Sequence, residues 1–319
     1  MFNSFLTLLI GFAAALVIAP PAIKFLHKLK FGQEIREIGP SWHKKKSGTP
    51  TMGGIIFIIA LLIAAAVNFR TVNSKYMLVL ISSLLFGAIG FIDDFIKVKR
   101  NLGLTSAQKF SMQLLVAVVF VLVGMHYGIL PTKIFIPFAK VYAELGWLYI
   151  PFALFVVLGT VNSVNLTDGI DGLATSVTII VMLFFSIALK DTPLTSFIYG
   201  LIGGLLGFLV FNKNPAKVFM GDTGSLFLGG AVAALAMVSE NPLILILVGF
   251  IYFAETLSVI IQVTSFKLTG KRVFKMSPIH HHFELGGWKE TKIVKRFFAA
   301  SCLLCIAGVL LWLNGNGGF

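Results

Sequence analysis

Five aspartates stand in short polar segments between long apolar stretches, where carboxylates are unusual. They are Asp93, Asp94, Asp168, Asp171 and Asp222. Mg²⁺ in proteins is typically held by one or two carboxylates together with phosphate oxygens and water. The residue types therefore favour metal-assisted chemistry on a phosphate group.

Asp93 and Asp94 close an apolar stretch long enough to form a membrane helix. A carboxylate at the C-terminal end of a helix faces the negative end of the helix dipole, so a positive charge must compensate it. A bound metal ion or the nearby Lys97, Lys99 and Arg100 could do this. The plainer interpretation is an acidic cap facing water, but ionisable groups beside a span are costly and tend to be functional.

Asp168 and Asp171 lie in the glycine-rich segment 165–173, between two apolar stretches. They are three positions apart, so one helical turn would place both carboxylates on one face. Gly169 and Gly172 allow unusual backbone angles and the close approach of a ligand. An ordinary Asx turn would explain the same residues without any function.

Asp222 lies in the string Gly-Asp-Thr-Gly-Ser at the predicted start of a helix. Free backbone N–H groups at a helix start can bind an anion, and the carboxylate could serve as a ligand to a hard metal ion. A Ser or Thr helix cap explains part of this pattern. It does not explain the aspartate.

Two basic segments complete the polar set. One ends at Lys46, and the other is Pro-Ile-His-His-His-Phe-Glu, which holds His280, His281 and His282. The first is also typical of a charge run that only orients a neighbouring span. Neighbouring side chains diverge by about 100° around a helix, so three consecutive histidines cannot all face one metal ion. Phosphate binding is a better interpretation than zinc. Glu255, within a later apolar stretch, has no identifiable partner.

The composition is that of a membrane protein. Of the 319 residues, 57% are apolar and only 12% are charged, and the mean hydropathy is +0.92. A soluble domain carries about a quarter charged residues, and a membrane span needs about 20 predominantly apolar residues. We predict one all-α, polytopic transmembrane catalytic domain over residues 1–319, with ten spans. The predicted spans are 4–23, 52–69, 77–95, 110–130, 148–164, 173–189, 196–211, 226–239, 243–263 and 297–313.

Most of the 26 Lys and Arg residues fall in the loops that follow odd-numbered spans. Positively charged loops stay in the cytoplasm, so these loops and the five aspartates are predicted to be cytoplasmic. Both termini are then extracytoplasmic. The net charge of +13 reflects orientation and attraction to anionic lipid. No nucleic-acid partner is expected, because the chain offers no soluble basic surface.

Carboxylates, cationic donors and glycine-rich turns on one face are the set that phosphoryl transfer requires. Five strings, spread along the chain, also carry a resemblance to a known family. They are KSGTPTMGG at 46–54, FIDDFIK at 91–97, NLTDGIDGL at 165–173, FMGDTGSL at 219–226 and PIHHHFE at 278–284. The chain resembles the phospho-N-acetylmuramoyl-pentapeptide transferases of the polyprenyl-phosphate N-acetylhexosamine-1-phosphate transferase superfamily.

The resemblance implies Mg²⁺-dependent transfer of phospho-MurNAc-pentapeptide from UDP-MurNAc-pentapeptide to undecaprenyl phosphate, giving lipid I and UMP. It implies a multi-pass protein of the bacterial inner (cytoplasmic) membrane and a possible homodimer. The catalytic residues would be Asp222 as metal ligand, Asp93 as base for the lipid phosphate, and Asp94 beside it. The substrate-binding residues that it implies are Lys46, Lys97, Asn165, Asp168, Asp171, Asn212, His280, His281 and His282.

Three alternatives stay open from the sequence. The lipid phosphate attacks the sugar-bearing phosphorus directly, or an aspartate attacks first and forms a covalent intermediate. The donor could instead be UDP-GlcNAc, as in a sister enzyme, although the histidine string argues against it. A transporter would keep its ionisable groups near the midplane within repeated halves, and no internal repeat is evident.

Overall fold

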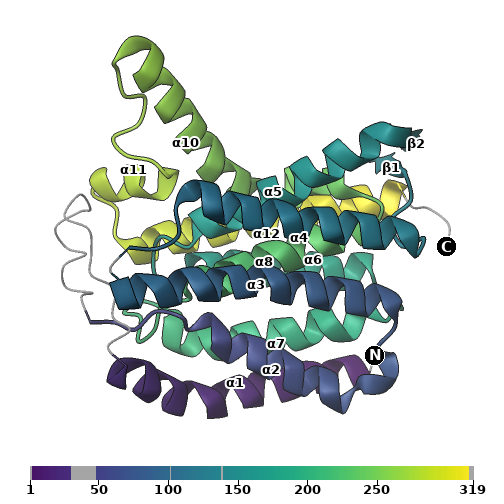
Figure 1. Cartoon of the computed structure of the whole chain (residues 1–319), viewed down its shortest axis with the longest axis horizontal. Helices are drawn as coiled ribbons and strands as arrows, with labels where there is room; N and C mark the ends of the chain where they lie inside the picture. Colours follow the sequence, from purple (N-terminus) through teal and green to yellow (C-terminus); the bar gives the residue numbers. More distant parts are fainter. Residues whose placement is uncertain (1, 30–47, 101, 138, 316–319) are drawn as a thin grey trace.

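The computed structural model describes residues 2–29, 48–100, 102–137 and 139–315, and helices dominate it (Figure 1). The long apolar stretches form these helices because every backbone group must be satisfied within a segment that crosses a bilayer. The helices are α1 (Phe2–Lys28), α2 (Gly54–Val67), α3 (Ser74–Arg100), α4 (Ser106–His126), α5 (Tyr149–Thr167), α6 (Leu173–Ala188), α7 (Leu194–Asn212), α8 (Gly221–Val238), α9 (Leu245–Val248), α10 (Phe250–Thr269), α11 (Ile279–Leu285) and α12 (Glu290–Gly315).

Every predicted span overlaps a helix, and the chain is a polytopic membrane protein. Eight described helices are long and apolar enough to cross a membrane, whereas the apolar helices α2 and α6 are shorter. The number of ten crossings therefore stays a prediction. The start of α1 and the end of α12 lie at the same end of the bundle (Figure 1), as an even number of crossings requires. The side of the membrane on which they lie also stays a prediction.

The predicted ninth span, 243–263, is not one helix. The short helix α9 ends before Gly249, and α10 begins at Phe250 and continues to Thr269. From this break α10 leaves the bundle at a steep angle (Figure 1). Its exposed apolar side chains would be covered by lipid in a membrane. They include Phe250, Leu257, Ile260, Ile261, Val263, Phe266 and Leu268.

Helix α8 forms the centre of the bundle, where it packs against α2, α3, α5 and α6. The helix is rich in Gly and Ala, which suits either a tilted span or tight packing, since small residues let membrane helices approach closely. The structure shows the close approach. A Cβ on Gly54 would lie 2.3 Å from the Cα of Gly224, and one on Gly229 would lie 2.6 Å from the Cα of Val161.

One two-stranded sheet interrupts the helical pattern between α4 and α5. Its strands β1 (Lys133–Ile136) and β2 (Val141–Glu144) pair antiparallel, with Lys133 opposite Glu144. The sequence analysis did not predict it. The hairpin lies at the end of the bundle that holds the end of α12, whereas α11 lies at the opposite end (Figure 1).

Candidate active site

The predicted acidic residues of α3 and α8 meet because these two helices touch at a glycine. A Cβ on Gly90 would lie only 2.0 Å from the carbonyl oxygen of Asp222, so no larger residue fits without a backbone shift. Gly90 lies one turn before Asp93 and Asp94 on α3. The contact therefore brings both carboxylates to the first turn of α8, where Asp222 lies.

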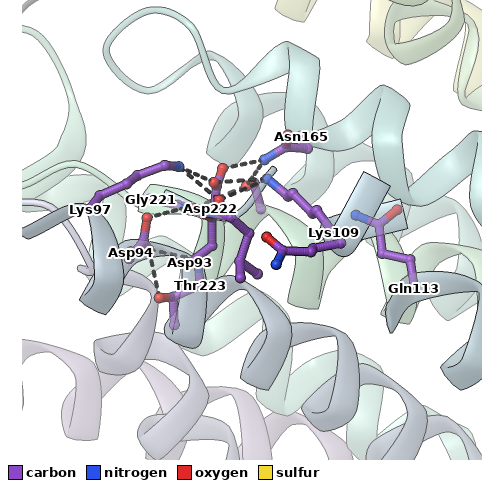
Figure 2. A network of polar contacts seen from close by, with 12 residues as sticks. Asp93, Asp94, Lys97, Lys109, Gln113, Asn165, Gly221, Asp222 and Thr223 are labelled. Carbon is purple, nitrogen blue, oxygen red and sulfur yellow. Dashed lines mark hydrogen bonds and ion pairs between the residues drawn. The ribbon is translucent and has the colours of Figure 1, made fainter. Parts of the chain in front are cut away.

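Four charged side chains form the centre of the site, and we call them the carboxylate–lysine cluster: Asp93, Lys97, Lys109 and Asp222. Lys97 Nζ lies 2.9 Å from Asp93 Oδ2 and also bonds Asp222 Oδ2. Lys109 Nζ lies 2.8 Å from Asp222 Oδ2 and 3.3 Å from Asp93 Oδ2. Figure 2 shows both lysines converging on Asp222 from different helices. Two positive and two negative charges balance within the cluster.

Asp93 is engaged on both oxygens. Its Oδ1 accepts the backbone N–H of Leu104 at 2.7 Å, and its Oδ2 takes the two lysines. The residue is only 2% exposed. The sequence predicts that Asp93 lies at a helix C-terminus, but α3 continues to Arg100. Its charge is compensated by Lys97, one of the predicted partners, and by Lys109.

Asp94 has different partners, all of them at the start of α8. Its carboxylate accepts the backbone N–H groups of Asp222 at 3.2 Å and Thr223 at 2.9 Å, and the Thr223 hydroxyl at 2.7 Å. A helix start offers such N–H groups to anions. The sequence analysis expected a ligand there. The anion that binds these two N–H groups is instead Asp94, a cap supplied by another helix.

Asn165 connects Asp222 to the end of α5. Its amide nitrogen lies 2.7 Å from Asp222 Oδ1 and 2.8 Å from the Ser225 hydroxyl. Ser225 in turn donates to the carbonyl of Gly221 at 3.0 Å. Both oxygens of Asp222 are thus oriented, Oδ1 by the amide and Oδ2 by the lysines.

Asp168 and Asp171 do not share one face, because residues 168–172 form a turn rather than a helical turn. Burial raises the pKa of Asp168 to about 8, with further contributions from the charges of Asp222, Asp94 and Asp171, while a hydrogen bond from the Gly221 backbone opposes the shift. Asp168 therefore belongs to the acidic site around α8.

Asp171 and Asn212 hold the segment between α7 and α8. Asp171 Oδ2 accepts the Asn214 side chain at 2.9 Å and the Ala216 backbone N–H at 3.0 Å. Asn212, which is 2% exposed, accepts from the Thr175 hydroxyl and donates to the Val218 carbonyl. These contacts give both predicted substrate residues a role within the protein.

The three histidines all lie on α11 and have separate partners. His280 Nδ1 lies 3.0 Å from Glu255 Oε2, and His281 Nδ1 lies 2.6 Å from Glu284 Oε2. His282 Nδ1 accepts the backbone N–H of Lys275 at 3.1 Å. Each histidine thus has a partner of its own within the protein. His280 is also the partner of Glu255 that the sequence could not supply.

The basic segment that ends at Lys46 lies outside the described residues. The described part of the same motif, from Gly48 onward, lies against Phe219 and Met220, which directly precede α8. Pro50 O accepts the backbone N–H of Phe219 at 2.8 Å, and Gly53 N–H donates back to Phe219 O at 2.8 Å. Gly54 N–H donates to Met220 O at 2.9 Å. The first motif therefore holds the residues that precede Asp222.

Lys109 is the residue of the cluster that the sequence analysis missed. By sequence it is one of the basic residues in the loop before the fourth predicted span. It lies in the first turns of α4, which begins with a capping box formed by Thr105 and Gln108. One turn further, the buried Gln113 accepts from Asn162 at 2.8 Å. A lysine followed by a glutamine four positions later, on an otherwise apolar helix, is the signal that could have indicated an inward-facing polar stripe.

The donor set suits a hard cation held partly by substrate. Within the described ranges, no group of three or more His, Cys, Asp and Glu side chains is placed to hold a metal ion. Mg²⁺ needs only one or two protein carboxylates when phosphate oxygens and water complete its shell. Asp222, oriented on both oxygens at the centre of the site, fits that requirement.

Comparison with known proteins identifies the class first. The family described as glycosyl transferase family 4 matches residues 76–240, which include the carboxylate–lysine cluster. Signature 1 of phospho-N-acetylmuramoyl-pentapeptide-transferase matches residues 46–58. A membrane bundle with this match and this site is a membrane-embedded glycosyl transferase.

Whole-chain relatives narrow the class to one family. The chain is 50% identical to the phospho-N-acetylmuramoyl-pentapeptide-transferase of Clostridium kluyveri over 97% of its own length and 99% of the relative's. It is 53% identical to that of Caldanaerobacter subterraneus over 92% of its own length and 94% of the relative's. It is 49% identical to that of Bacillus mycoides over 95% of both chains. The chain belongs to the phospho-N-acetylmuramoyl-pentapeptide-transferase family.

Proposed function

We propose that this chain transfers phospho-MurNAc-pentapeptide from UDP-MurNAc-pentapeptide to undecaprenyl phosphate, with Mg²⁺, at the cytoplasmic face of the bacterial inner membrane. The observation that carries the proposal is the carboxylate–lysine cluster at one end of a membrane bundle, in a chain of this family. The cluster can meet a soluble pyrophosphate, and the bundle gives access to a lipid. A homodimer is part of the proposal.

The reaction breaks one phosphoanhydride bond and forms another. An oxygen of the lipid phosphate attacks the phosphorus that carries the sugar. The bond from this phosphorus to the bridging oxygen breaks, and UMP leaves with that oxygen. Bound to Asp222, Mg²⁺ would supply charge neutralisation for the pyrophosphate. The new product is the lipid-linked pyrophosphate.

Lys97 and Lys109 are the residues best placed to bind phosphate oxygens. Each now contacts both Asp93 and Asp222, so an incoming pyrophosphate would compete for the same ammonium groups. Drawing the lysines toward phosphate would free Asp222 Oδ2 for the cation. Substrate and metal are therefore expected to bind cooperatively. Phosphate draws the lysines away from Asp222, and a cation on Asp222 releases the lysines for phosphate.

Asp93 is proposed to accept the proton of a lipid phosphate that is not fully ionised. Direct attack is the simpler mechanism, since a phosphate monoester is largely ionised near pH 7 and its need for a base is modest. The alternative requires Asp93 or Asp222 to attack the phosphorus that carries the sugar, forming an acyl phosphate with the sugar phosphate while UMP leaves. Incubating the enzyme with donor and Mg²⁺ but without lipid tests this choice. A covalent phosphosugar adduct, detected by mass spectrometry of the intact protein, would overturn direct attack.

Asp94 is proposed to act indirectly, by positioning Asp222 without contacting the substrate. Its three hydrogen bonds fix the start of α8 and thus the position of Asp222. We propose that Asn165, Asp168, Asp171 and Asn212 act on the uridine and pyrophosphate side of the donor. Lys46, His280, His281 and His282 are proposed to contact its phosphate or sugar groups.

An Asp222→Asn variant tests the proposal directly. We expect UMP release to fall by at least about a hundredfold, the scale of losing one electrostatic contact to a transition state, with no recovery as Mg²⁺ is raised. Asp191→Asn is the matched control, because Asp191 lies in a loop on the predicted extracytoplasmic side. This variant should keep full activity. Wild-type activity in Asp222→Asn would remove the centre of the proposal.

The choice of donor separates the proposal from the sister activity. Purified enzyme should release UMP from UDP-MurNAc-pentapeptide and not from UDP-GlcNAc when undecaprenyl phosphate is the acceptor. Turnover of UDP-GlcNAc at a comparable rate would favour the sister enzyme. Movement of the lipid across liposomes without any nucleotide-sugar would favour a transporter.

A further inference from the structure

Glu255 is a buried carboxylate that the proposed reaction does not use. It lies on α10 with no exposed surface, and a carboxylate in an apolar span is costly unless it has a partner. Its Oε2 lies 3.0 Å from His280 Nδ1 and accepts the backbone N–H of the same residue at 3.3 Å. One carboxylate oxygen thus holds both the ring and the backbone of His280.

These contacts decide which ring nitrogen carries the hydrogen. A carboxylate oxygen accepts, so the Nδ1 of His280 carries the hydrogen of this bond. His280 is 1% exposed, and within the described part of the chain its Nε2 has no hydrogen-bond partner. A carboxylate that bonds one ring nitrogen and so fixes the tautomer of a functional histidine is a common arrangement.

The opposite edge of the ring, at Nε2 and Cε1, lies against the turn that carries Asp168. A Cβ on Gly169 would lie 2.2 Å from His280 Nε2 and 2.4 Å from its Cε1. Only glycine allows the ring this close to the backbone. A continuous chain of contacts therefore runs from Glu255 through His280 to Gly169, and the neighbouring Asp168 is hydrogen-bonded to Gly221 beside Asp222.

We infer that Glu255 is a positioning residue: it holds His280 in the Nδ1–H form, and the ring holds the Gly169 turn on the nucleotide-sugar side of the site. The inference rests on the proposed function, because the turn is assigned to the donor substrate. It connects the projecting helix α10 to the donor side through one histidine. Removing Glu255 should therefore weaken binding of the nucleotide-sugar and leave binding of the lipid unchanged.

Kinetics of four variants test this. Glu255→Ala should raise KM for UDP-MurNAc-pentapeptide by about tenfold, the scale seen when a carboxylate that orients a ligating histidine is lost, with KM for undecaprenyl phosphate unchanged. Glu255→Gln should stay within about threefold of wild type, since its amide oxygen can still accept both donors. His280→Ala should match Glu255→Ala, and the double variant should be no worse than either. The exposed Glu144→Gln is the matched control. Additive losses, or equal changes in both KM values, would overturn the inference.

A second pair of variants tests the contact with the turn. Gly169→Ala should displace the ring and raise KM for the nucleotide-sugar as His280→Ala does. Removing the ring makes room for the new methyl group, so Gly169→Ala combined with His280→Ala should be no worse than His280→Ala alone. A further loss in the combined variant would show that Gly169 acts independently of the ring.

A spectroscopic readout separates this inference from the proposed function. In protein labelled with ¹⁵N-histidine, the His280 signals, assigned by their loss in His280→Ala, should show the Nδ1–H tautomer. Glu255→Ala should shift them, whereas Glu255→Gln should not. An Nε2–H ring in the wild type would overturn the inference even if transfer is confirmed. A wild type without transferase activity but with the Nδ1–H signal would overturn only the proposed function.

Discussion

At the residue scale, two lysines occupy the carboxylate oxygens that a cation would also need. Lys97 and Lys109 each contact Asp93 and Asp222, and the four charges cancel. Near a protein surface, unit charges about 4 Å apart interact by roughly 4 kcal/mol. A change of one lysine therefore alters the affinity for a divalent cation as well as for phosphate.

Lys109→Met should tighten the binding of Mg²⁺ in the absence of substrate, by roughly tenfold or more, because it removes a competing positive charge. The same variant should lose transferase activity, since a phosphate partner is gone. Isothermal titration in detergent measures the first effect and UMP release the second. Lys99→Met is the control, because Lys99 lies over the Phe95 ring on the same helix as Lys97. Weaker Mg²⁺ binding in Lys109→Met would contradict the competition.

Asp168 gives the site a dependence on pH. Burial and three neighbouring carboxylates raise its pKa from 3.8 to about 8, so the folded protein binds a proton that the unfolded chain releases. Stability should therefore fall as pH rises from about 4 to 8 and level off above that. In detergent with a chelator, the melting temperature of Asp168→Asn should rise relative to that of wild type as pH increases from about 4 to 8. The melting temperature of Asp191→Asn should change with pH as that of wild type does. If the difference between Asp168→Asn and wild type is the same at every pH, the raised pKa of Asp168 is refuted.

At the element scale, the site depends on how closely α3 approaches α8. Gly90→Ala would place a methyl group 2.0 Å from the Asp222 carbonyl oxygen. We expect a stability loss of about 1–3 kcal/mol, as for other overpacked contacts, and a larger proportional loss of activity because Asp222 moves. Thermal melts and UMP release measure the two. Gly159→Ala on α5, where a Cβ meets nothing, should keep both properties. Equal behaviour of the two variants would contradict this role for Gly90.

The elements could be predicted from the sequence much better than their contacts. Long apolar runs fix helices locally, so each predicted span fell on a helix. The break at Gly249 and the β1–β2 hairpin were missed, because hydropathy averages over about 20 residues and hides a short interruption. The motifs identified which residues matter. They could not show that Asp94 caps α8 or that Glu255 holds His280, because both contacts join segments far apart in sequence.

Lys109 is a residue whose place in the site could not be predicted from the sequence. A single lysine beside a span is expected for orientation alone, and Gln113, four positions later, is a weak local sign that Lys109 turns inward. Its partners Asp93 and Asp222 lie on two other helices. Only the packing of α3, α4 and α8 decides its role.

At the scale of the whole molecule, the orientation can be tested with single cysteines. Lys140→Cys lies in the hairpin predicted to be extracytoplasmic, and Lys271→Cys lies in a loop predicted to be cytoplasmic; both positions are exposed. In intact cells a membrane-impermeant maleimide should label the first and reach the second only after permeabilisation. Cys302 and Cys305 are replaced by Ser beforehand to remove background. Labelling of Lys271→Cys in intact cells would reverse the topology.

The cap on α8 has a consequence for how the protein is made. Asp93 can pair with Lys97 on its own helix as soon as α3 is synthesised. The hydrogen bonds of Asp94 cannot form so early, because the N–H groups that it binds belong to residues 128 and 129 positions later. During insertion by the ribosome-bound translocon, α3 must therefore hold a carboxylate that lacks these hydrogen bonds until α8 emerges. The newly made N-terminal half is inert and costly to hold in lipid, and the arrival of α8 both completes the helix pair and creates the site.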